Sequence, residues 1–116
     1  VEHLTDRSDA AYRIRAVEGK IAGYQSSIDK LEQQKTEKDA DIQLAYEKLA
    51  ALQASKANRT PRQQEEIDTN IRTMADKQSR LQSELEDIVL QQQALQAQLE
   101  QEQQLMLRLQ EGGDGQ

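Results

Sequence analysis

The side chains that most often perform catalysis or bind metals are scarce in this sequence. There is no cysteine, and His3 is the single histidine, so the chain lacks both a nucleophile with its base and a zinc site of His and Cys ligands. No glycine-rich phosphate loop occurs, and the acidic residues are spread along the chain. We therefore expect a protein that is not an enzyme and that binds no metal or other cofactor.

The composition predicts a protein with a thin core. Aromatic residues make up 3% of the 116 residues, charged residues make up 31%, and Phe and Trp are absent. Such a chain lacks the large side chains from which a layered globular core is built. Disordered chains and coiled coils share this composition, so the periodicity of the apolar residues must distinguish between them.

Apolar residues recur at alternating spacings of three and four, which is typical of helices that pack along a narrow seam. In the first half these seam residues, at positions a and d of the heptad, are Ile14, Val17, Ile21, Tyr24, Ile28, Leu31, Lys35, Lys38, Ile42, Ala45, Leu49 and Leu52. In the second half they are Ile67, Ile71, Met74, Gln78, Leu81, Leu85, Ile88, Gln92, Leu95, Leu99, Glu102, Met106 and Leu109. We predict helices over residues 5–57 and 61–111, and a flexible glycine-rich tail over 112–116.

The segment between the two runs is predicted to reverse the chain. Asn58 suits a left-handed cap at the end of the first helix, and Pro61 suits the first position of the second. Thr60 and Gln63 have the spacing of a capping box. Because a short turn makes the helices antiparallel neighbours, we predict an all-α fold. Residues 1–111 would form one two-helix antiparallel coiled-coil hairpin with its turn at about 57–61.

Charges beside the seam favour one register of the hairpin. An antiparallel seam pairs a with d, and one allowed register places Asp41 opposite Lys77. A shift by one heptad places Asp41 against Glu84 and Lys48 against Lys77, and both pairs are repulsive. Although each exposed pair contributes only a few tenths of a kcal/mol, we expect the first register.

Five polar residues occupy the seam, namely Lys35, Lys38, Gln78, Gln92 and Glu102. In the expected register Lys38 faces Gln78 and Gln92 faces Tyr24, so hydrogen-bonding groups meet. We interpret these layers as specifying the register at some cost in stability. The alternative is a weakened zone around Lys35 to Asp41 that lets the hairpin bend or be bound by a partner.

Three surfaces outside the seam are candidate contacts for a protein partner. The tip carries cations on an acidic molecule, and its residues are Lys56, Asn58, Arg59 and Arg62. A small-residue stripe on the outer face of the first helix permits close approach of another helix, and consists of Ala16, Gly19, Gly23 and Ser26. An apolar base near the end of the second helix consists of Leu105, Leu107 and Leu109. The surplus of apolar residues also suggests homo-oligomerisation through four-helix packing.

The net charge of −6 disfavours binding to nucleic acid and to anionic membranes. No apolar run approaches the roughly 18 residues of a spanning helix, so we expect no membrane insertion. Without a visible signal peptide, a cytoplasmic location is slightly favoured over a periplasmic or secreted one.

As a free-standing, polar, Gln-rich coiled coil, the chain resembles the stalk-like proteins of flagellar and type III export, although it shares no sequence motif with them. The resemblance implies a scaffold or adaptor that bridges a protein complex, in a bacterium. The alternative is the hairpin arm of a larger transport, toxin or receptor-binding protein. A nucleic-acid-binding arm is less favoured because of the acidic charge.

Overall fold

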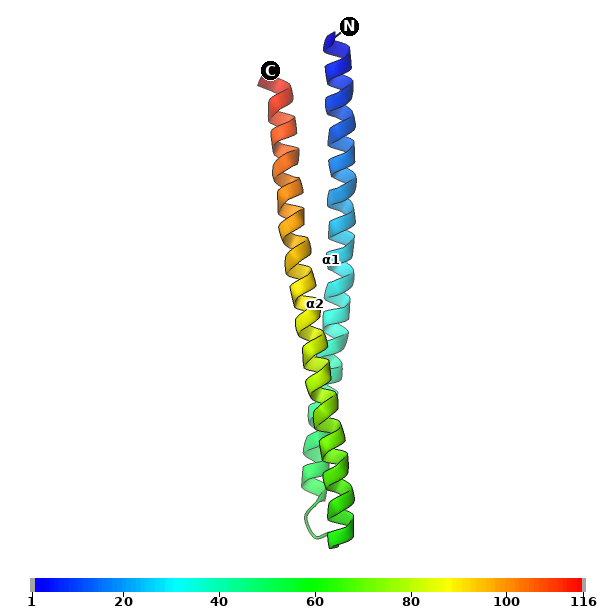
Figure 1. The fold of residues 1–116 in the computed structure, drawn as a ribbon. Helices are drawn as coiled ribbons and strands as arrows, with labels where there is room; N and C mark the ends of the chain where they lie inside the picture. The colour runs from blue at the N-terminus through cyan, green and yellow to red at the C-terminus, as the bar shows by residue number, and fades with distance from the viewer. Residues whose placement is uncertain (1, 116) are drawn as a thin grey trace. The chain divides into compact units, whose positions relative to one another are not determined.

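The protein folds into two long helices. The computed structural model describes the backbone of residues 2–115 and the side chains of residues 9–112. Helix α1 is Glu2–Ser55 and helix α2 is Pro61–Gly115, with 54 and 55 residues. No strand occurs in the described part of the chain. The predicted all-α fold, an antiparallel helical hairpin, is confirmed (Figure 1).

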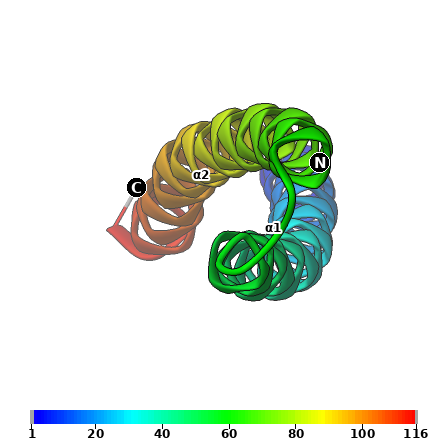
Figure 2. The same cartoon turned by 90° about the horizontal axis from the view of Figure 1, so that it is seen from below.

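The turn is held by the caps that the sequence predicts. Asn58 has φ 63°, in the left-handed region. The Gln63 amide donates to Thr60 Oγ1 (3.2 Å), and the Thr60 amide donates to Gln63 Oε1 (3.1 Å). These reciprocal bonds satisfy backbone donors that the first turn of α2 leaves free. Seen from this end, the loop crosses from the end of α1 to the start of α2 (Figure 2).

The helices differ from the predicted ones at three ends. α1 begins at Glu2, before the predicted start, and ends at Ser55, where the Lys56 amide bonds to the Gln53 carbonyl (3.3 Å) and so tightens the last turn. α2 continues through Gly115, four residues beyond the predicted end. Glycine lowers helix stability by roughly 1 kcal/mol per residue but does not forbid helical dihedral angles. The flexibility of the tail stays a prediction, and Gln116 lies outside the described residues.

Burial follows the heptad pattern along both helices. In α1 every predicted seam residue from Ile14 to Leu52 is buried or half-buried, and every residue between them is exposed. In α2 every predicted seam residue from Ile67 to Leu109 is likewise buried or half-buried. The three-and-four spacing therefore identifies the face of each helix that packs against its neighbour.

The chain forms two compact units. The turn unit comprises residues 33–90, and the terminal unit comprises residues 1–32 and 91–116. In the turn unit the buried residues Ile42, Ala45 and Leu81 form an apolar cluster, against which Met74 and Leu85 pack. In the terminal unit the buried residues are Val17 and the polar Gln92.

The predicted register is wrong by about one heptad. In the turn unit Lys38 lies opposite Glu84 rather than Gln78, with 2.6 Å between Nζ and Oε2. In the terminal unit Gln92 Nε2 donates to the carboxylate of Glu32 (2.8 Å), whereas the predicted register placed Gln92 opposite Tyr24.

The path of the loop explains the shift. Residues 56–60 continue past the end of α1, beside the first turns of α2, instead of making a tight reversal, so α2 begins beyond the end of α1 (Figure 1). Gln64 Nε2 holds this path by donating to the carbonyls of Arg59 (3.3 Å) and Lys56 (3.5 Å). Glu84, which was expected to repel Asp41 in this register, pairs with Lys38. The charges beside the seam did not predict the register, because a long charged side chain can reach several partners and each exposed pair contributes little energy.

Candidate interaction surfaces

Two of the three cationic side chains at the tip make contacts within the hairpin. Lys56 Nζ lies 2.9 Å from Asp68 Oδ1, and Arg59 Nε donates to the Ser55 carbonyl (3.1 Å). Arg62 is exposed in the first turn of α2, and Asn58 is exposed in the turn itself. The cations Lys56 and Arg59 therefore stabilise the turn, in addition to any contact they make with a partner.

The small-residue stripe lies on the outer face of α1, where Ala16, Gly19, Gly23 and Ser26 are all exposed. A Cβ added at Gly19 or Gly23 would meet nothing within 4 Å. The packing of the hairpin therefore does not require glycine at either position. Tyr12 precedes Ala16 by one helical step on the same face and is 75% exposed, a residue that the sequence analysis did not single out.

The apolar base is exposed to unequal degrees. Leu107 is 56% exposed and Leu105 is 37% exposed, whereas Leu109 is half-buried in the seam. A further apolar residue, Leu90, is 62% exposed on α2 and was not predicted as a surface residue. Leu90 could have been recognised from the sequence, because it lies outside the a and d positions and its neighbours on that face of the helix are small or polar.

The polar seam residues have different surroundings. Lys38, whose side chain is 24% exposed, makes the ion pair with Glu84, and its hydrogen bond lowers the pKa of the Glu84 carboxyl below the usual range. Gln92 is 7% exposed and is satisfied by Glu32 and by the Ile28 carbonyl, 3.5 Å away. Glu102 differs from both, because its buried Oε2 has no hydrogen-bond partner and its Oε1 lies 3.9 Å from Lys20 Nζ.

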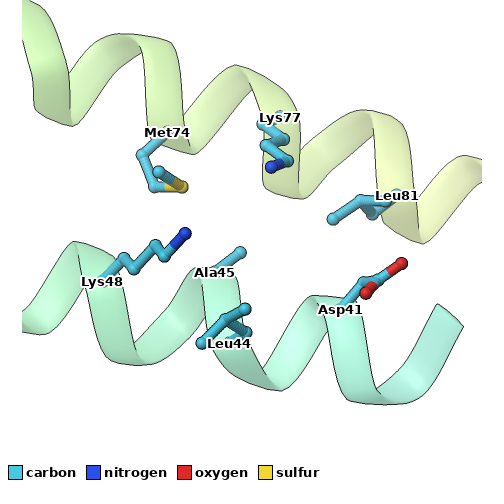
Figure 3. Close-up of a pocket in the computed structure, with 7 residues that line it drawn as sticks. All are labelled: Asp41, Leu44, Ala45, Lys48, Met74, Lys77 and Leu81. Atoms are coloured by element: carbon cyan, nitrogen blue, oxygen red, sulfur yellow. The ribbon is translucent and has the colours of Figure 1, made fainter. Parts of the chain in front are cut away.

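A pocket opens between the helices of the turn unit (Figure 3). Its volume is about 130 Å³, and its lining residues are Asp41, Leu44, Ala45, Lys48, Met74, Lys77 and Leu81. This pocket was not predicted from the sequence, because the expected register paired Asp41 with Lys77. In the structure neither residue makes an ion pair with a described residue.

Comparison of the chain with protein-family models, with curated proteins and with solved structures finds no match. Neither helix, over the residues described, has an apolar stretch of the length that a membrane crossing requires. The same residues contain no cluster of three or more His, Cys, Asp or Glu side chains arranged to hold a metal ion.

Proposed function

We propose that this chain is a non-enzymatic scaffold or adaptor, a helical hairpin that bridges a protein complex through its outward faces. The observation that carries the proposal is the presence of large apolar side chains outside the seam. Tyr12, Leu90 and Leu107 are each more than half exposed, although the seam already supplies the apolar residues that hold the hairpin together. Each of these side chains offers an apolar contact point to a protein partner.

Site-specific crosslinking in the native cell tests this function. A photoreactive phenylalanine analogue would replace Tyr12, Leu90 or Leu107 in turn, with the exposed polar positions Gln34 and Gln101 as matched controls. We expect defined protein adducts at the apolar positions and none at the controls. Equal crosslinking at all five positions, or none at any, would contradict the proposal.

The tip supports a second candidate, the arm of a larger transport, toxin or receptor-binding protein. Its capping box and its Lys56–Asp68 ion pair stabilise the turn that such an arm would present to a partner. Changing Arg59 and Arg62 to Glu should abolish partner recovery in a pull-down if the tip is the contact. Full recovery by the double variant would remove the tip and leave the outward faces.

A further inference from the structure

The pocket of the turn unit arises from one small seam residue. Ala45, 3% exposed, occupies a seam position between the larger side chains of Ile42 and Leu49, and Leu81 is 7% exposed at the same pocket. The missing side-chain volume at Ala45 leaves a space of about 130 Å³ beside Met74. A cavity of roughly 150 Å³ holds a benzene ring. The slightly smaller space beside Ala45 therefore has room for one aliphatic side chain.

The rim of this pocket carries two like charges. Lys48 of α1 and Lys77 of α2 both line it, and Figure 3 shows their ammonium groups directed toward the space between the helices. Neither lysine makes an ion pair with a carboxylate in the described part of the chain. Asp41 lines the other end of the pocket, next to Leu81 (Figure 3).

Two other lysines of the turn unit have an acidic partner across the hairpin. Lys38 pairs with Glu84, and Lys56 pairs with Asp68, at 2.6 and 2.9 Å. With two lysines and one aspartate, Asp41, the pocket lining has a net positive charge, and neither lysine forms an ion pair with a described carboxylate. Two ammonium groups at one opening therefore attract an anion. The apolar floor then favours an anion attached to an aliphatic group. The 48% exposed Leu44 extends this apolar surface from the pocket to the outside.

We infer that this pocket binds an amphipathic helix of another protein, placing one aliphatic side chain over Ala45 and Met74 and one carboxylate between Lys48 and Lys77. A helix presents residues four apart on one face, so a leucine and a glutamate at that spacing provide both groups. This inference rests on the proposed function, because it specifies the chemistry of one protein partner. It uses none of the outward positions tested by crosslinking.

The test is an NMR titration of the full chain, labelled at methyl groups, with a helical peptide. The peptide carries one Leu and one Glu four residues apart in an Ala- and Gln-rich sequence. We expect shifts at the Ala45 and Met74 methyl groups, and much weaker shifts when the peptide Leu becomes Ala or its Glu becomes Lys. An absence of pocket shifts, or equal binding of the Lys peptide, would overturn the inference.

Variants of the chain give the second readout. Changing Lys48 and Lys77 together to Gln should weaken peptide binding about three- to tenfold, whereas Lys30→Gln, at an exposed position outside the pocket, should leave it unchanged. Ala45→Leu should fill the cavity and abolish binding, with circular dichroism verifying that the helices persist. Undiminished binding by either pocket variant would overturn the inference.

Two further outcomes separate this inference from others. If the unmodified chain self-associates and the double lysine variant does not, the pocket belongs to a second copy, and the inference fails. If crosslinking at Tyr12, Leu90 and Leu107 fails while the peptide binds at the pocket, the proposed outward faces are wrong and the pocket remains.

Discussion

The turn unit and the terminal unit share one heptad pattern but differ in what fills it. The turn unit has the contiguous cluster of Ile42, Ala45 and Leu81, with Met74 and Leu85 packed against it. The terminal unit buries Val17 and the polar Gln92. An identical spacing of residues therefore produces regions of unequal stability, because burial of apolar area contributes more than a satisfied polar layer.

The ion pairs accentuate this difference. In the turn unit Lys38 and Lys56 have acidic partners across the hairpin at 2.6 and 2.9 Å. In the terminal unit the Lys20 ammonium lies 3.9 Å from Glu102, which keeps one buried oxygen without a hydrogen bond. We therefore expect the terminal unit to open first, with lower protection of its amides against hydrogen exchange.

The largest effect should come from the apolar cluster. Leu81→Ala removes a side chain that is 7% exposed, and should lower the free energy of unfolding by about 2–5 kcal/mol. Leu95→Ala, at the half-buried equivalent position of the terminal unit, should cost about 1–2 kcal/mol. Urea denaturation monitored by circular dichroism measures both. Equal costs would show that the two units are equally well packed.

Glu102→Leu should reduce the difference in stability between the two units. It removes the oxygen that has no hydrogen bond and adds apolar area to the seam, so the terminal unit should gain about 1–3 kcal/mol. Hydrogen exchange of the backbone amides in residues 91–111 reports the gain. The matched control is Glu100→Leu, at an exposed position, which should change protection little. A loss of protection in Glu102→Leu would mean that the weak Lys20 contact stabilises the unit.

Replacing the two glycines of the small-residue stripe should also stabilise the protein, but by a smaller amount. Gly19→Ala and Gly23→Ala should each stabilise α1 by about 0.5–1 kcal/mol, because the added Cβ meets nothing within 4 Å. Thermal unfolding measures the gain, and the reverse change Ala22→Gly at a nearby exposed position should cost a similar amount. A destabilised glycine variant would reveal a second helix already packed on this face.

The smallest expected effect is a pH dependence confined to the turn unit. The hydrogen bond from Lys38 lowers the pKa of Glu84 in the folded state, so the stabilisation is present above the usual carboxyl range and is lost as the pH falls through the lowered value. The Glu84 side chain is 44% exposed, which makes the contribution modest. The stability difference between wild type and Glu84→Gln should shrink on acidification. A difference independent of pH would exclude the ion pair as its source.

Burial along the helices was predictable because one physical rule determines it. Three-and-four spacing places side chains on one face of a helix, so the burial of the seam residues from Ile14 to Leu109 follows from their positions. It does not predict the half-buried residues of α2 beside the seam, such as Ala75 and Val89. The turn was predictable for the same reason, since Thr60, Pro61 and Gln63 act through local hydrogen bonds and dihedral preferences.

The register and the pocket were not predictable in this way. The register depends on the path of the loop, where Gln64 contacts the carbonyls of Lys56 and Arg59, and no spacing rule anticipates these contacts. Competing exposed charge pairs differ by only a few tenths of a kcal/mol, too little to decide between heptad shifts. The pocket follows from the register, because the small Ala45 leaves a space only where the facing residues do not fill it.

Both described ends of the chain, the start of α1 and the finish of α2, belong to the terminal unit. Tension applied at these ends would therefore load one layer of the seam at a time instead of shearing all layers together. The layers around Glu102 and Gln92 would separate first, and the cluster around Ile42 and Leu81 would yield last. The terminal unit would therefore unfold at a lower force than the turn unit.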